Sequence, residues 1–495
     1  MKKSGLQRVL GKWNLTAIGV GAIIGAGIFV MTGIGAREHA GPALALSFVI
    51  AGIGCTFAAL CYAEFASFLP VEGSAYAYSY ATMGELFAWI IGWDLILEYA
   101  MASGAVAVGW SGYVGKFLNL FGLKLPMWLS VDSFTANTAI EKVAGNADKT
   151  SELLTHYSSL DLPTIFGYHF SFNLPAFLII WLVTFILVKG IKEAANTNII
   201  MVAIKLTVVL FIIVVGSMYI DIKNWTPFIP EKAMIVTQAG NSREAYGFMG
   251  ILSGAAYIFF AYIGFDTVST QAGEATNPKK DVPFGIIVSL LVCTVLYILV
   301  ALVLTGMVKY SNIDVNAPIA YAFASQGLKF AVFIISIAAI AGLTSVTIVM
   351  LMGQSRIFYA MSKDGLLPKG IFGELHPKYK TPYKASLLTG FVVSLIAAFI
   401  PISKIAELVN IGTLLAFVMV CAAVMFMRYK EPSRERPFRA PALWIVAPLG
   451  IAFNLAMMFS LDEVNWLRLG IWLLIGGLVY FWYGRKHSVI NMARK

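Results

Sequence analysis

The chain has 495 residues, of which 59% are hydrophobic and only 13% are charged. A soluble globular domain carries about 25% charged residues, so this composition excludes a soluble protein of this length. A formal net charge of +10 would indicate a nucleic-acid partner only if the basic residues gathered on a folded polar domain. They lie instead between long apolar runs, so we expect a membrane protein and no nucleic-acid binding.

Twelve apolar segments follow one another along the chain, and most of them approach or exceed the roughly 20 residues that a membrane-crossing helix needs. We predict an all-α polytopic membrane protein with twelve transmembrane helices. The expected helices cover residues 15–35, 43–69, 87–120, 174–190, 199–220, 246–270, 283–308, 330–361, 385–400, 405–427, 442–460 and 466–483. An even number of spans places both termini on the same side.

The basic residues outside these segments predict the orientation. Most of them lie in the N-terminus, in the connections after even-numbered segments and in the C-terminal tail. Because cytoplasmic loops carry the excess of Lys and Arg, we expect a multi-pass protein of the cell membrane with both termini cytoplasmic. The basic stretches 356–384 and 428–439 then face anionic membrane lipids, at about 1 kcal/mol per basic residue near the surface. The long connection 121–173 is extracellular, a cap or a tolerated insertion.

Two segments contain interruptions. The first carries four glycines, Gly19, Gly21, Gly25 and Gly27, each of which weakens a helix by about 1 kcal/mol relative to Ala. Close helix packing through Gly21 and Gly25 is one explanation, and an unwound stretch that faces a ligand is the other. In the sixth segment, Gly264 stands close to Asp266.

Segments one and six occupy corresponding positions if segments 1–5 and 6–10 are repeats. Matching interruptions in two halves are the best sequence indication of a transporter's midplane binding site. We therefore expect a cytoplasmic N-terminus (1–13), a first inverted repeat (14–220), a second inverted repeat (221–430), and two added spans with a cytoplasmic C-terminus (431–495). N–H groups at a broken helix suit a carboxylate, and freed carbonyls suit an ammonium, so the substrate class is an amino acid.

Several motifs also resemble the amino acid–polyamine–organocation superfamily, and in particular its cationic amino acid transporter branch. They are Gly25-Ala26-Gly27-Ile28-Phe29, Pro70-Val71-Glu72-Gly73-Ser74-Ala75-Tyr76, Gly92-Trp93-Asp94-Leu95-Ile96-Leu97-Glu98-Tyr99, and Phe265 to Thr270 continued from Glu274 to Pro283. The similarity runs from about Trp13 to the last spans. It implies two five-helix inverted repeats, with helices 1 and 6 broken, plus helices 11 and 12, and transport by alternating access.

The resemblance also implies the substrate-binding residues. The carboxylate is expected at the first break, at Ile24, Gly25, Ala26 and Gly27. The amino group is expected at the carbonyls of Ile23, Phe260, Ala261 and Ile263, and Met350 is expected to face the side-chain pocket. Ala26 is a departure, because relatives often carry Ser or Thr there, so a hydroxyl contact to the carboxylate is missing.

Among the charged residues inside the apolar segments, we single out Asp94, Glu98, Lys205 and Asp266. Intramembrane charges are expensive and are candidates for function. Lys205 either snorkels toward the interface or ties the first broken span to span five and supplies the coupling charge, as the resemblance implies for proton-driven members. For Asp94, a purely structural role is one interpretation, in which the side chain pairs with the backbone or caps a turn. For Glu98 and Asp266, a structural role and a role in proton coupling are both open. The hydroxyls of Thr344, Ser345 and Thr347 keep a sodium-coupled alternative open.

The predicted function is proton-coupled symport of neutral L-amino acids into the cell. A cationic amino acid transporter or an exchanger is the alternative. The five histidines are scattered and form no metal pair or nucleophile–base group, so we expect no enzyme activity, no cofactor and no metal. The sequence gives no sign of an accessory membrane subunit.

Overall fold

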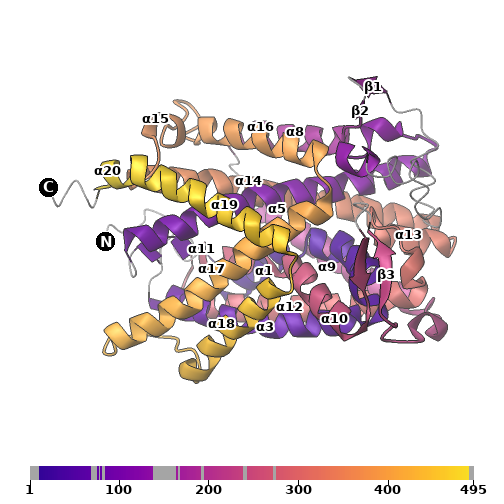
Figure 1. Cartoon of the computed structure of the whole chain (residues 1–495), viewed down its shortest axis with the longest axis horizontal. Helices are drawn as coiled ribbons and strands as arrows, with labels where there is room; N and C mark the ends of the chain where they lie inside the picture. Colours follow the sequence, from indigo (N-terminus) through magenta and orange to yellow (C-terminus); the bar gives the residue numbers. More distant parts are fainter. Residues whose placement is uncertain are drawn as a thin grey trace.

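The computed structural model describes residues 10–68, 75–76, 79–80, 84–137, 163–165, 168–190, 194–237, 242–270 and 275–489. Figure 1 shows a bundle of helices that run side by side along the long axis of the molecule, with two small hairpins at one end. The all-α, polytopic character predicted from the sequence is confirmed. Part of the predicted connection 121–173 and the segments 69–74, 77–78 and 81–83 lie outside the described residues.

Each of the twelve predicted segments is helical. Within the described residues, seven helical stretches are long and apolar enough to cross a membrane, and four more apolar helices are shorter; that twelve spans cross it stays a prediction. The main helices are α1 (Lys12–Ile23), α3 (Leu44–Phe68), α5 (Glu85–Leu120), α8 (Leu174–Lys189), α9 (Ala194–Ser217), α10 (Gly247–Ile258), α12 (Pro278–Met307), α14 (Lys329–Lys363), α16 (Tyr383–Phe399), α17 (Ile402–Lys430), α18 (Leu443–Phe459) and α19 (Glu463–Val479).

Shorter elements lie between them, and the sequence did not single out most of these. They are η3 (Gly41–Ala43), η4 (Met127–Leu129), η5 (Ile222–Trp225), η7 (Tyr310–Asn312), α13 (Pro318–Ser325), α15 (Lys369–Phe372), η8 (Tyr480–Gly484) and α20 (Arg485–His487). The antiparallel hairpins are β1 (Thr164–Ile165) with β2 (Tyr168–His169), and β3 (Ala233–Val236) with β4 (Ser242–Ala245). Helix α12 begins five residues before the predicted start, because Pro278 suits the first turn of a helix.

Both predicted interruptions are breaks in the helices. After α1 ends at Ile23, the chain resumes as a π-helical turn, η1 (Gly27–Met31), and continues through α2 (Thr32–Gly35) and η2 (Ala36–Ala40). After α10, the chain tightens into a 3-10 turn, η6 (Phe259–Tyr262), and restarts as α11 (Thr267–Thr270). Between η6 and α11, Gly264 has a φ of +114°, which favours glycine over residues with a side chain.

Three pairs of helices that are five apart in the predicted order of spans pack against each other. Helix α3 lies along α12, α5 along α14, and α8 along α16. Helix α1 packs between α12 and α9, and η1 contacts η6. This pairing brings the two broken helices together inside the bundle.

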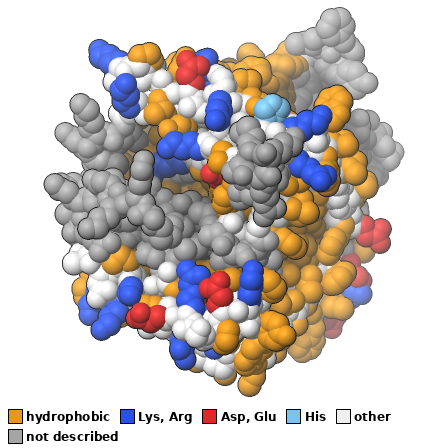
Figure 2. Space-filling model, turned by 90° about the vertical axis from the view of Figure 1, so that its left-hand side faces the viewer, with side chains coloured by type: hydrophobic (Ala, Val, Ile, Leu, Met, Phe, Trp, Pro, Cys, Tyr) orange, Lys and Arg blue, Asp and Glu red, His pale blue; other side chains and the backbone are white. Residues whose placement is uncertain are grey.

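The two ends of the bundle differ. The described chain begins and ends at one of them, which we call the terminal end, and hairpin β3–β4 lies at the other, the hairpin end (Figure 1). Figure 2 looks onto the terminal end and shows many Lys and Arg side chains around it, with apolar side chains along the flank.

An ion-paired carboxylate holds three segments together at the terminal end. Glu64 of α3 is fully buried, and its carboxylate accepts hydrogen bonds from Nε and Nη2 of Arg428 at 2.9 and 2.7 Å and from the Ala440 backbone N–H at 2.8 Å. Arg436 Nε lies 3.3 Å from the same carboxylate. These contacts fix the connection between α17 and α18 against α3.

Candidate functional site

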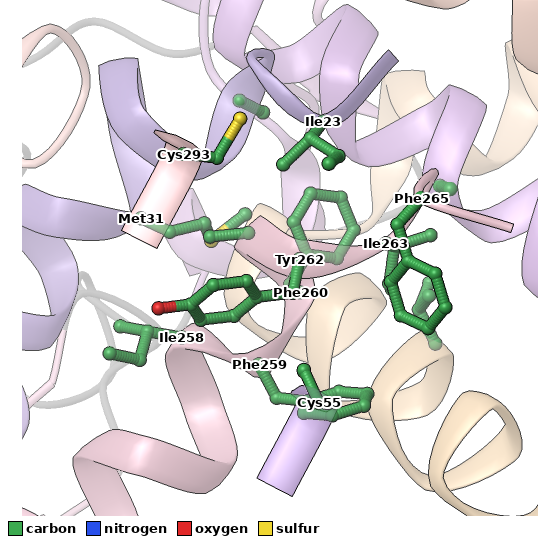
Figure 3. Close-up of a cluster of buried hydrophobic side chains, with 14 of the residues drawn as sticks. Ile23, Met31, Cys55, Ile258, Phe259, Phe260, Tyr262, Ile263, Phe265 and Cys293 are labelled. Atoms are coloured by element: carbon green, nitrogen blue, oxygen red, sulfur yellow. The ribbon is translucent and has the colours of Figure 1, made fainter. Parts of the chain in front are cut away.

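The two breaks are in direct contact. A Cβ atom at position 27 would lie 2.4 Å from the Cα atom of Ala261, and one at position 264 would lie 3.0 Å from the Ala22 carbonyl oxygen. The main chains therefore approach each other at a distance that only glycine permits. Figure 3 shows Ile23 from the first broken helix in one buried cluster with Phe260, Tyr262 and Ile263 from the second.

A buried tyrosine joins the two breaks. The Tyr297 hydroxyl, from α12, lies 2.8 Å from the Ile23 carbonyl and 2.8 Å from the Ala261 carbonyl. The Phe260 carbonyl accepts a hydrogen bond from the Ile263 N–H at 3.2 Å. Three of the four carbonyls predicted to bind an amino group thus already have a neighbour within hydrogen-bond distance, although a carbonyl oxygen can accept a second bond.

Asn410 of α17 supports the second break. Its side-chain amide donates to the carbonyls of Ala256 and Tyr257 at 2.9 and 2.8 Å, which lie in the last turn of α10 and have lost their helical donors. Asn410 is fully buried, and its Oδ1 has no hydrogen-bond partner among the described residues. The sequence reasoning missed Asn410 and Tyr297, because one polar residue in an apolar helix gives no pattern.

The first break faces α14. Its residues Ile24, Gly25 and Ala26 precede η1, and the first N–H groups of a helical stretch have no intrahelical acceptor. A Cβ atom at position 25 would lie 3.2 Å from a methyl group of Val346. Met350 follows Val346 by four residues and so lies on the same face of α14, and it is 3% exposed. Val346 was not predicted.

Lys205 connects three helices near the first break. Its Nζ donates a hydrogen bond to the Gly21 carbonyl at 2.9 Å, which links α9 to α1. Its side chain also lies against Gly342 of α14, where an added Cβ would be 3.2 Å from Cε. Lys205 is 1% exposed, so its ammonium does not snorkel to an interface. A role in coupling stays a prediction.

The three acids form a separate group. Glu98 lies close to Asp94, Asp266 and Thr413, and the Thr413 hydroxyl donates to the Val409 carbonyl of its own helix at 3.1 Å. All three carboxyl groups are buried, and neither oxygen of Asp94 has a hydrogen-bond partner among the described residues. Lys205 instead contacts Gly21 of α1 and Gly342 of α14. The structure therefore divides these four charged residues into a lysine beside the first break and an acidic group near the second.

A polytopic helical protein in which two broken helices meet inside the bundle has the architecture of a membrane transporter. The sequence matches the amino acid permease family over residues 10–462, and the C-terminal region of such permeases over residues 438–488. The chain belongs to the amino acid permease family, whose named relatives are transporters rather than enzymes.

Three relatives illustrate the range of the family. The chain is 45% identical to a branched-chain amino acid permease of Bacillus subtilis, over 98% of this chain and 95% of the relative. It is 43% identical to a methylthioribose transporter of Bacillus subtilis, over 99% of this chain and 96% of the relative. It is 38% identical to a vacuolar cationic amino acid transporter of Arabidopsis thaliana, over 87% of this chain and 61% of the relative.

Proposed function

We propose that the protein imports neutral, branched-chain L-amino acids together with protons, by alternating access across the cell membrane. The observation that carries the proposal is the contact between the two broken helices at Gly27 and Ala261. Such a contact places main-chain donors and acceptors next to each other inside a bundle, where irregular backbone is tolerated when it lines a site. The substrate carboxylate binds at Ile24–Gly27 and its amino group at the carbonyls of Ile23, Phe260, Ala261 and Ile263.

The arrangement of the helices supports the proposed mechanism. Pairing of α3 with α12, of α5 with α14 and of α8 with α16 is what two interlocked five-helix repeats require. In this proposal the repeats span residues 14–220 and 221–430, twelve spans cross the membrane, and both termini are cytoplasmic. The basic terminal end (Figure 2) supports that orientation.

The side-chain preference rests on α14. Val346, which lies against Gly25, and Met350 on the same helix face are both apolar. Burial of apolar surface stabilises a bound aliphatic side chain by about 25 cal/mol per Å², whereas a cationic side chain needs an acidic partner there. The branched-chain permease among the relatives supports the same substrate class.

Proton coupling rests on Lys205. Its ammonium lies between α1 and α14, the helix that carries Thr344 and Thr347, two of the hydroxyl residues that the sodium alternative needs. The hydroxyls of these two threonines donate to carbonyls of their own helix. Loss of the proton from Lys205 would weaken its charge-assisted hydrogen bond to the Gly21 carbonyl and so loosen its hold on the first broken helix. In the same proposal, Glu98 and Asp266 carry protons near the second break.

Uptake into proteoliposomes tests the proposal. The purified protein should accumulate labelled leucine, isoleucine and valine when the lumen is made alkaline, and an imposed sodium gradient should have no effect. Arginine and methylthioribose belong in the panel, because relatives are named for cationic amino acids and for methylthioribose. Accumulation of either in preference to leucine would overturn the assigned substrate class, and uptake driven by sodium alone would overturn the assigned coupling ion.

A further inference from the structure

The hydroxyl of Tyr297 lies between carbonyl oxygens of the two breaks. It is 2.8 Å from two carbonyl oxygens, those of Ile23 and Ala261. A hydroxyl has one proton, and carbonyl oxygens only accept. Tyr297 can therefore fully satisfy one of the two carbonyls, and three oxygen atoms at this point share a single proton.

Both carbonyls are ones that the breaks set free. Ile23 is the last residue of α1, so its carbonyl has lost the donor that a continued helix would provide. Ala261 lies in η6, which is followed by extended backbone at Ile263. The C-terminal end of α1 adds partial negative charge. The site is thus short of donors and favourable for a cation.

The position of the hydroxyl is fixed. Tyr297 is 0% exposed, and its ring packs against the rings of Phe48 and Tyr262 with centroids 5.3 and 5.6 Å away. A ring held from α3 and from η6 cannot swing its hydroxyl out of the gap between the breaks. The packing of the helices therefore fixes the contact of the hydroxyl with both carbonyls.

We infer that the Tyr297 hydroxyl and the carbonyls of Ile23 and Ala261 together form the acceptor group for a substrate's primary ammonium. An ammonium has three N–H donors, and these three oxygens offer three acceptors. Tyr297 keeps one carbonyl satisfied while the site is empty and accepts a bond from the ammonium when it is filled. The inference rests on the proposed function and assigns to Tyr297 the selection of amino acids over compounds without a primary amine.

The test compares two ligands that differ at one group. L-2-Hydroxy-4-methylpentanoate has a hydroxyl where L-leucine has its ammonium, and each is measured by competition against labelled leucine. The Tyr297→Phe variant should reduce the preference for leucine over the hydroxy acid by about tenfold or more, because a hydrogen bond to a charged group is lost. Binding of the hydroxy acid should change much less.

Tyr262→Phe is the matched control. Tyr262 is also fully buried and packs against Tyr297, but its hydroxyl donates to the Phe48 carbonyl of α3 at 2.8 Å. Its removal should leave the preference for leucine unchanged. An equal loss of both ligands in Tyr297→Phe, or an unchanged preference, would overturn the inference. Absence of leucine binding to the wild-type protein would overturn the proposed function as well.

A second measurement keeps the hydroxyl in place and therefore does not depend on the stability of Tyr297→Phe. Fluorotyrosine is incorporated at position 297, and at position 262 as the control, and its ¹⁹F resonance is recorded. Leucine should shift the resonance at position 297 more than the hydroxy acid does, whereas the two ligands should act alike at position 262. Equal shifts at position 297 would contradict the assignment.

Discussion

At the scale of single residues, Lys205 makes the most specific link between a charge and the first broken helix. Its Nζ bonds the Gly21 carbonyl, two residues before α1 ends. The Lys205→Ala variant removes both the proton carrier and this bond, and an unpaired buried carbonyl costs about 1–3 kcal/mol. We expect uptake driven by a proton gradient to fall at least tenfold, measured in proteoliposomes at equal protein content.

The matched control for this change is Lys309→Ala, because Lys309 is exposed. It should transport like the wild type. Retained pH dependence of uptake in Lys205→Ala would show that another group carries the coupling proton, and Glu98 or Asp266 would then be tested first.

At the scale of the helices, Gly27 sets how closely the two breaks approach. In Gly27→Ala the added methyl carbon would meet the backbone of Ala261 at 2.4 Å, and such overpacking costs about 1–3 kcal/mol. We expect lower thermal stability in detergent and at least tenfold slower leucine uptake. Gly115→Ala is the control, since nothing lies within 4 Å of a Cβ there. Normal uptake by Gly27→Ala would mean that the breaks need not stay in contact.

The sequence predicted the helices and their breaks well, because both leave regular signals. Long apolar runs marked the spans, and Gly25, Gly27 and Gly264 marked the irregular backbone. The sequence did not predict the contacts that hold the two breaks together. Tyr297 and Asn410 lie far along the chain from the carbonyls they bond, and their roles depend on which helices become neighbours. Val346 was missed for the same reason, and the role of Met350, which the family resemblance implied, stays a prediction.

At the scale of the whole molecule, charge and apolar surface are distributed as a membrane requires. The flank of the bundle is apolar, and the terminal end is rich in Lys and Arg (Figure 2). The Glu64 pairing with Arg428 and Arg436 lies at that end and secures one of its basic connections. Charge inside the bundle is confined to a few buried groups, so the two polar ends should be the surfaces that meet water.

The orientation of these ends can be measured with thiol labelling, because all four native cysteines are buried and free. Ser311→Cys places a thiol in η7 at the hairpin end, and Gly370→Cys places one in α15 at the terminal end; both positions are exposed. An impermeant maleimide added to intact cells should label the first variant, and the second should react only after the membrane is permeabilised. The unsubstituted protein should stay unlabelled in both conditions. The reverse pattern would invert the proposed topology, and labelling of both variants in intact cells would contradict a bundle whose two ends lie on opposite sides of the membrane.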